Sequence, residues 1–367
     1  MDNLSIYIHI PFCEQKCPYC DFYSISDKSE YDNYTEKLIE RIRYYSSIYK
    51  RKICSVYFGG GTPSVIGIKR LIKILTSVKD SFEIENDCEI TVEVNPCSAE
   101  TLDFSLLKKE GFNRLSVGLQ SADENELKIL GRRHTAAIAK KTVERARNAG
   151  FNNISLDLML CIPKQTKSSL TKSIEFCKDC GVEHISAYIL KIEENTPFFR
   201  MQETLSLYDD DSQAEMYIHA VNELEKHGFI QYEISNFSKI GFEGKHNLRY
   251  WKDKEYLGIG PSAHSFVDGK RFYYTRSLYD FYNNITVDDG IGGDVEEYMM
   301  LSLRLKEGLN LLKLKEKYNF IPNENFLQRA NKLKSEGLVT FSNETISLTK
   351  EGFLVSNMII NFLTDAL

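Results

Sequence analysis

Three cysteines near the amino terminus have the spacing of a metal-binding loop. Cys13, Cys17 and Cys20 form a C-x3-C-x2-C run. Thiolates are soft ligands that favour iron–sulfur clusters, zinc or copper(I). With three cysteines and no obvious fourth, one iron of a cubane cluster would stay open to bind a small molecule. The spacing therefore predicts an iron–sulfur cluster in this loop.

Two other interpretations of the cysteine loop stay open at this point. Cys13 and Cys17 could form a disulfide, although the chain shows no sign of an oxidising compartment. The three thiolates could instead hold a structural zinc ion with His9 as the fourth ligand. His9 lies in a run of alternating isoleucines, IYIHI, and is equally compatible with a packed core histidine.

A glycine-rich segment, GGGTP at 59–63, follows a predicted strand. Glycines allow a backbone to approach a ligand closely and to present its N–H groups. The segment is not a P-loop, because the Gly-Lys-Ser/Thr ending is absent. Three consecutive glycines exceed what a tight turn needs, so ligand contact is favoured over a plain turn.

Polar residues recur where predicted strands end. Glu93 follows Val92 in an otherwise apolar strand, and a buried carboxylate is costly unless it is paired. Its partner could be a ligand ammonium group or a neighbouring basic side chain. For Asp157, Gln120 and Arg132 as well, the polar partner could be either a ligand or a neighbouring side chain. Each signal is weak alone, but together these positions predict a ligand pocket.

Two later segments contain histidine and aromatic residues. HNLRYW at 246–251 holds the only Trp of the chain. Its His246 could ligate haem iron, although composition alone favours a polar loop closing over the mouth of a barrel. LGIGPSAH at 257–264 loosely matches a dinucleotide-binding pattern, but no clear strand–helix context supports it. We therefore predict no dinucleotide site there.

Strand and helix patterns alternate through the first half of the chain. Such units predict a parallel sheet with helices outside, either doubly wound or an open barrel. In a barrel, the polar residues at the strand ends would share one rim. A curved, barrel-like sheet is therefore favoured. The six predicted strands span 4–10, 53–58, 88–95, 114–120, 154–160 and 184–190.

The second half predicts a helix near 209–227 and one strand at 229–238. From about Asp294 the pattern predicts a winged-helix-like domain that acts as a lid or docking module. Its helices are predicted at 294–307, 310–318 and 323–336, before a hairpin at 338–349 that turns at Ser342 and Asn343, and a final helix. The predicted domains are 1–200, 201–290 and 291–367.

Composition limits the possible classes of protein. The 367 residues are 42% hydrophobic and 27% charged, as in an ordinary globular protein. The net charge of −6 gives no basic field for nucleic acid. No apolar run approaches the ~20 residues of a membrane-spanning helix, and the first residues do not form a signal peptide. Nine cysteines in a chain of this length do not form a disulfide scaffold. Together, these observations predict that the protein resides in a reducing cytoplasm.

The cysteine spacing, with Tyr19 just before the last cysteine, resembles the signature of radical S-adenosylmethionine (SAM) enzymes. YIHIPFC, GGGTPS, EVNP, RLSVGLQS, LGRRH, NISLDLM and HNLRYW together resemble the radical SAM coproporphyrinogen III oxidase-like family over nearly the whole chain. The resemblance implies an α/β fold: a partial (β/α)6 barrel with a smaller C-terminal α+β winged-helix-like domain.

The resemblance also implies a set of ligands. Cys13, Cys17 and Cys20 would hold a [4Fe–4S] cluster, and SAM would chelate the open iron through its amino and carboxylate groups. The positions that match the SAM pocket of the family are Tyr7, Tyr19, Gly60, Gly61, Thr62, Glu93, Gln120, Arg132 and Asp157.

Two functions diverge within this family. The oxygen-independent coproporphyrinogen III oxidase carries a longer amino-terminal arm and a fourth cysteine, where this chain has Phe22. The HemW haem-chaperone subgroup is marked by H-N-x-x-Y-W, present here from His246 to Trp251. The resemblance therefore implies a haem chaperone, with His246 as haem ligand, that delivers haem to respiratory proteins, which could lie at a membrane surface. Oxidative decarboxylation of coproporphyrinogen III by a 5′-deoxyadenosyl radical is the alternative.

Overall fold

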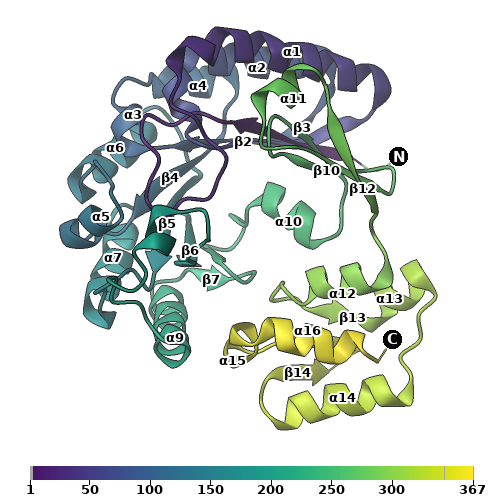
Figure 1. Ribbon diagram of the computed structural model, residues 1–367. Coiled ribbons are helices and arrows are strands. Elements are labelled where there is room, and N and C mark those ends of the chain that lie inside the picture. The colour runs from purple at the N-terminus through teal and green to yellow at the C-terminus, as the bar shows by residue number, and fades with distance from the viewer. Residues whose placement is uncertain (1–2, 343, 367) are drawn as a thin grey trace.

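Six parallel strands form the centre of the main sheet and follow one another in chain order. The computed structural model describes residues 3–342 and 344–366. The sheet curves inside a layer of helices but does not close, so the predicted partial (β/α)6 barrel is confirmed (Figure 1). The strands are β1 (Leu4–Ile10), β2 (Lys52–Gly60), β3 (Glu83–Val94), β4 (Arg114–Gln120), β5 (Ile154–Leu160) and β6 (His184–Ile189).

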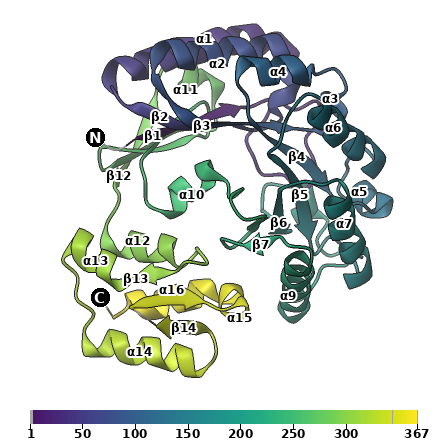
Figure 2. The same cartoon turned by 180° about the vertical axis from the view of Figure 1, so that it is seen from behind.

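Helices cover the outer face of this sheet (Figures 1 and 2). Residues 96–110 form two helices, α3 and α4, because the Asp103 side chain caps a new helix start. The helices are α1 (Tyr31–Ile48), α2 (Ile68–Ser81), α3 (Pro96–Ala99), α4 (Phe104–Glu110), α5 (Glu124–Ile129), α6 (Ala136–Asn148), α7 (Lys167–Asp179), α8 (Pro197–Arg200) and α9 (Asp210–Lys226).

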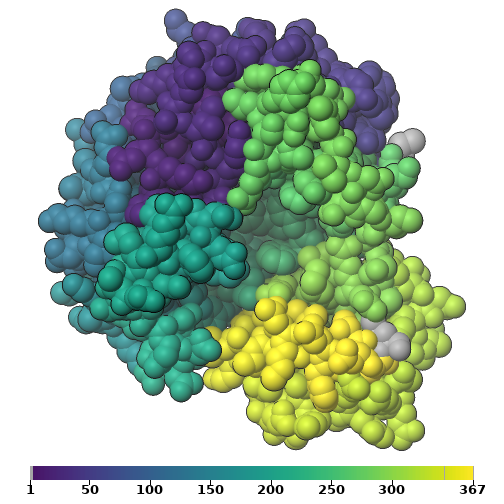
Figure 3. Space-filling view, viewed as in Figure 1, coloured from purple at the N-terminus to yellow at the C-terminus, as the bar shows by residue number. Residues whose placement is uncertain are grey.

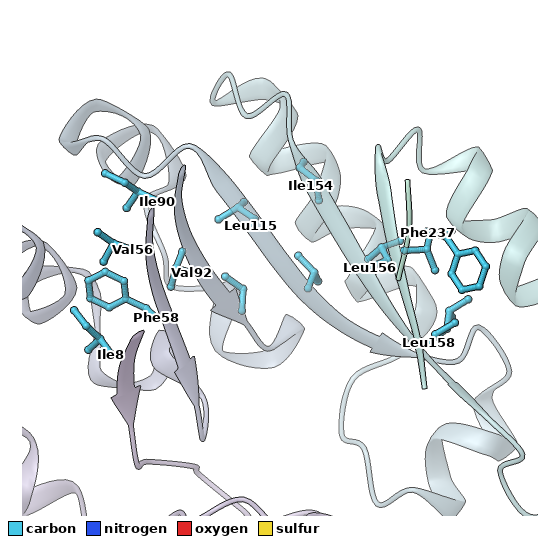
Figure 4. Packing of buried hydrophobic residues seen from close by; sticks show 14 of the residues in the cluster. Ile8, Val56, Phe58, Ile90, Val92, Leu115, Ile154, Leu156, Leu158 and Phe237 are labelled. Atoms are coloured by element: carbon cyan, nitrogen blue, oxygen red, sulfur yellow. The ribbon is translucent and has the colours of Figure 1, made fainter. Parts of the chain in front are cut away.

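The two faces of the sheet differ in polarity because successive side chains of a strand point to opposite sides. On the outer face Ile8, Phe58 and Leu115 are fully buried against the helices (Figure 4). Each such side chain contributes roughly 1.5–3 kcal/mol to folding. The inner positions of the same strands carry polar groups, among them Ser5, Ser55 and Ser155. The outer face therefore stabilises the fold and leaves the inner face for other roles.

Further strands extend the sheet at both edges. Next to β1 lie β9 (Tyr256–Ile259), β10 (His264–Val267), β11 (Lys270–Tyr274) and β12 (Thr286–Ile291), with α11 (Leu278–Tyr282) before the last of them. The β9 strand runs parallel to β1, whereas β10, β11 and β12 pair in antiparallel fashion. We call β9–β12 the sheet extension.

At the other edge, the prediction of one strand at 229–238 was wrong. This segment forms an antiparallel hairpin of β7 (Ile230–Gln231) and β8 (Asn236–Ser238). The buried Glu233 carboxylate closes its turn by accepting hydrogen bonds from the Ser235 N–H and the Asn236 side chain. HNLRYW is not a loop but the helix α10 (Lys245–Trp251), which lies inside the curve of the sheet (Figure 2).

The carboxyl-terminal residues form a separate α+β domain, as predicted. A helix, a strand, two helices and a hairpin follow one another in the order of a winged helix. Ser342 ends the first hairpin strand, and Asn343 of the predicted turn lies outside the described residues. The elements are α12 (Val295–Ser302), β13 (Leu309–Asn310), α13 (Leu311–Tyr318), α14 (Glu324–Ser335), β14 (Val339–Ser342), β15 (Thr345–Leu348), α15 (Lys350–Leu354) and α16 (Ser356–Thr364).

Hydrogen bonds and ion pairs anchor this domain to the barrel at several places, among them an ion pair of 2.6 Å between Lys350 of α15 and Glu225 of α9. The Ile234 N–H donates to the Arg304 carbonyl oxygen over 3.0 Å, beside the β7–β8 turn. The Asp253 carboxylate, just after α10, lies 2.5 Å from the Lys317 ammonium group of α13. Among the described residues, no helix is long and apolar enough to cross a bilayer.

Candidate functional site

The loop that carries Cys13, Cys17 and Cys20 begins at the carboxyl end of β1. Its base is closed by backbone hydrogen bonds from Cys13 N–H to Ile25 O (3.0 Å) and from Ile25 N–H to Pro11 O (2.8 Å). All three thiols are free and partly buried. The Arg132 guanidinium donates to the Cys17 sulfur over 3.6 Å. The loop therefore presents three available thiols beside a cation.

The residues of the loop fit a cluster better than a single metal ion. Within residues 3–342 and 344–366, no three His, Cys, Asp or Glu side chains lie close enough together to hold a single metal ion. His9 is occupied elsewhere, because its ring nitrogens lie 3.1 Å from the Tyr7 hydroxyl and 3.1 Å from the Tyr23 carbonyl oxygen. A cubane cluster takes a different iron for each thiolate, so three separated thiolates suit it.

The glycine-rich segment packs directly on the strand that leads into the cysteine loop. Gly60 has φ +107°, and a Cβ there would lie 2.5 Å from the His9 ring. A Cβ at Gly61 would lie 2.6 Å from the Phe12 carbonyl oxygen. The Thr62 N–H donates to that same oxygen over 2.7 Å. Glycines are needed here because the glycine-rich segment packs so closely on the end of β1 and the start of the cysteine loop. Contact between the glycine-rich segment and a ligand stays a prediction.

Two carboxyl groups inside the barrel, Glu93 and Asp157, form no salt bridge with another described residue, although the buried Arg114 lies near both. The Tyr57 hydroxyl donates to Glu93 over 2.8 Å, and the Ser116 hydroxyl donates to Asp157 over 3.0 Å. Burial raises the pKa of Glu93 to about 8 and that of Asp157 to about 6. Buried carboxyl groups with raised pKa values are typical of sites that bind a polar or cationic ligand.

The other predicted SAM residues also gather at this end of the barrel. Tyr7 faces the interior, with its ring centre 6.2 Å from that of Tyr57. Gln120 ends β4 with a positive φ of 71°, and Arg132 donates to the Gly118 carbonyl oxygen over 2.8 Å. Tyr19, within the cysteine loop, lies beside Cys17 and Arg132, and its ring centre is 6.2 Å from that of Phe198.

His246 lies on the amino-terminal side of the barrel interior, where its ring stacks on Tyr57 at 5.1 Å between centres and lies 6.5 Å from Tyr7. Its Nδ1 is 2.8 Å from the Ser55 hydroxyl, and its Nε2 is 2.8 Å from the Tyr250 hydroxyl. The residue is 2% exposed, and its own backbone N–H donates to Glu89. Ser55 and Glu89 belong to the amino-terminal halves of their strands, whereas the cysteine loop follows a carboxyl end. Ligation of iron by His246 would require one of these bonds to break, so that role stays a prediction.

Some residues of the interior were missed in the sequence. Tyr57, Ser116 and the buried Arg114 face the same space as Glu93 and Asp157. The alternation of residues along the strands could have identified them. Every second residue of a strand points to the interior, and each of the six strands carries polar residues at such positions. A hollow opens onto this interior, between the cysteine loop (purple), the segment after β6 (teal), the sheet extension (green) and the carboxyl-terminal domain (Figure 3).

Comparison with known proteins agrees with this arrangement. Residues 7–177 match the model of the radical SAM superfamily, and residues 294–355 match that of the HemN C-terminal domain. The solved structure of coproporphyrinogen III oxidase (HemN) from Escherichia coli superposes with a TM-score of 0.85, covering 100% of this chain and 91% of that one, at 21% identity. The protein is thus a radical SAM protein with the fold of HemN.

Full-length relatives define the family more closely. The heme chaperone HemW of Lactococcus lactis is 33% identical over 372 residues, covering 98% of this chain and 97% of the relative. HemW of Bacillus subtilis is 35% identical over 369 residues, covering 96% and 97%. The chain belongs to the HemW family. Membership of the radical SAM superfamily implies a [4Fe–4S] cluster and SAM.

Proposed function

We propose that this protein is a haem chaperone, which binds haem and delivers it to acceptor proteins. The observation that carries the proposal is the match to curated heme chaperones over nearly the full length of both chains. The open hollow beside the cysteine loop supports it, because a large planar ligand needs an accessible site (Figure 3).

The cluster and SAM belong at the rim of the barrel in this proposal. Cys13, Cys17 and Cys20 hold the [4Fe–4S] cluster, whose open iron is the site that SAM occupies when bound. Glu93 and Asp157 hydrogen-bond polar or cationic parts of SAM from inside the barrel. The remaining proposed contacts come from Tyr7, Tyr19, Gly60, Gly61, Thr62, Gln120 and Arg132.

Exposed aromatic side chains at the same rim support the binding of a porphyrin. Phe22 is 66% exposed and Tyr279 is 71% exposed. Phe22 directly follows Asp21, and Tyr279 is three residues after Arg276. Asp21 and Arg276 form an ion pair of 2.6 Å that joins the cysteine loop to the sheet extension. We propose the cytoplasm as the compartment and haem-requiring respiratory proteins as the acceptors.

A second candidate function is oxygen-independent oxidation of coproporphyrinogen III. The structural likeness to HemN favours it, although at 21% identity that likeness supports the fold alone. Phe22 argues against it, because a cysteine is expected there by resemblance to the oxidase.

Two assays on anaerobic, cluster-reconstituted protein distinguish these functions. A titration with haem, followed by the Soret absorbance, should give a saturable band. Incubation with coproporphyrinogen III, SAM and a reductant should give no protoporphyrinogen. Formation of that product would contradict the chaperone proposal, and the absence of a saturable haem band would remove it.

A further inference from the structure

Axial ligation of haem iron needs an accessible side chain with a free donor atom, and among the described histidines His264 combines the two. His134 Nδ1 and His227 Nε2 also lack a hydrogen-bond partner, but these atoms are buried. The chain has seven histidines, all within the described residues. His264 is the one that is exposed, and no hydrogen bond joins its ring nitrogens to another described residue. His9, His184 and His246 are buried with both ring nitrogens in hydrogen bonds. The other three, His134, His219 and His227, are buried or partly buried.

The pairing of the strands places His264 on the inner face of the sheet. Tyr256 of β9 pairs with Ser5, an inner residue of β1, and Phe266 of β10 pairs with Tyr256. Residues two apart on a strand share a face, so His264 lies on the same face as Phe266. The Tyr256 ring packs 4.5 Å from Tyr250 of α10, which confirms that this face looks into the barrel.

The same residue lies at the rim that carries the cysteine loop. Because β9 runs parallel to β1, the turn between β9 and β10 lies at the carboxyl end of β1. In that turn a Cβ at Gly260 would lie 2.8 Å from the His9 carbonyl oxygen. His264 is the first residue of β10, directly after the turn. Its side chain therefore faces the hollow near the cysteine loop.

The surroundings of His264 suit an axial ligand. Its ring stacks on Tyr273 at 4.8 Å between centres and 21° between planes, which holds the imidazole in one orientation. Partial burial lowers the pKa of His264 below 6.5, so the ring is neutral at pH 7 and keeps a lone pair. The half-exposed Arg276 follows β11 at this end, where its guanidinium pairs with the Asp21 carboxylate of the cysteine loop.

We propose that His264 is an axial ligand of the haem iron, with the porphyrin in the hollow between the sheet extension and the cysteine loop. This inference rests on the proposed function. It differs from ligation by His246 in a simple way: His264 can bind iron without breaking any described hydrogen bond, whereas His246 cannot.

The test is an anaerobic haem titration of the reconstituted full chain and three variants. His264→Ala should weaken haem binding by about tenfold or more and shift the Soret band. Free imidazole should restore the band of this variant, because it can fill the vacated coordination position. His219→Ala, on the outer helix α9, is the matched control and should bind as the wild type does. Circular dichroism of each variant checks the fold.

The remaining outcomes separate the two proposals. Wild-type affinity and an unshifted Soret band in His264→Ala would overturn the inference but leave the chaperone function standing. Loss of the band in a folded His246→Ala protein, with His264→Ala unchanged, would assign the iron to His246. Failure of the wild type itself to bind haem would overturn both proposals.

Discussion

At the scale of single residues, the interior of the barrel is defined by two buried carboxyl groups that form no salt bridge with another described residue, although Arg114 lies near both. Tyr57 and Ser116 satisfy one oxygen each of Glu93 and Asp157. Neutral donors of this kind offset only part of the cost of burying a carboxylate. Burial therefore favours the protonated form of Glu93 at neutral pH, and binding of a polar or cationic ligand would favour its ionised form.

This arrangement predicts how stability depends on pH. The pKa of Glu93 is raised to about 8 in the folded protein, so between the unfolded value near 4.5 and about 8 the folded state binds more protons. The free energy of unfolding must then fall as the pH rises through this window. Glu93→Gln, without SAM, should gain on the order of 2 kcal/mol relative to wild type at pH 8 and little at pH 5. Urea denaturation at both pH values measures this, and an equal change at both would contradict it.

The cysteines allow a second prediction at this scale. Anaerobic reconstitution of the wild type should yield about four irons per chain. Cys13→Ala should lose most of this iron, whereas Cys97→Ala should keep it. Cys97 is a suitable control because it is a partly buried thiol in a pocket that also includes Cys17. Iron analysis and the visible spectrum give the result, and loss of iron in both variants would contradict the assignment.

At the scale of elements, α10 holds together strands that are distant in sequence. Glu89 of β3 accepts the N–H groups of Lys245 and His246. Ser55 of β2 and Tyr250 engage the His246 ring. The helix thus fills the amino-terminal end of the barrel through its polar contacts.

His246→Ala should therefore be destabilising whatever its effect on haem. It removes the hydrogen-bond partner of the Tyr250 hydroxyl and one of the two partners of the Ser55 hydroxyl, and it creates a cavity, for a loss of about 2–4 kcal/mol. Tyr250→Phe removes one of the two bonds and should cost about 1 kcal/mol. Chemical denaturation measures both. Wild-type stability in His246→Ala would contradict a structural role for this residue.

The anchoring of the carboxyl-terminal domain gives a prediction for a second element. The Asp253 side chain is 1% exposed and accepts from Lys317 and from the Tyr318 hydroxyl. Asp253→Ala should loosen α13 from the barrel and speed hydrogen exchange of amides in 311–318. Lys252→Ala, which breaks only the exposed contact with Glu307, is the control. Equal exchange in both variants would show that Asp253 does not anchor the domain.

The elements that the sequence predicted well are those with a strong local pattern. The boundaries of the strand at 4–10 and of the helix near 209–227 were predicted correctly to within a few residues. The hairpin at 229–238 was missed because its turn is stabilised by a buried Glu233 rather than by glycine or proline. The burial of His246 could not be predicted either, since its partners Ser55 and Glu89 are more than 150 residues away and are set by tertiary packing.

At the scale of the whole molecule, the open sheet leaves space for a ligand larger than a closed barrel could hold. A closed barrel would leave room only for small groups, whereas this sheet leaves a hollow bounded by the extension and the carboxyl-terminal domain (Figure 3). The predicted cysteine loop and strand-end residues lie on the rim of this hollow. A chaperone needs both a site for its ligand and a way for the ligand to leave, and an open hollow provides both.

Haem transfer tests the central claim most directly. Haem-loaded wild type is mixed with a haem-free respiratory enzyme in membrane vesicles, and recovery of its haem spectrum is followed over time. The rate should rise with acceptor concentration and exceed the spontaneous release of haem to apomyoglobin. A rate equal to that of spontaneous release, at every acceptor concentration, would contradict the function proposed for this protein.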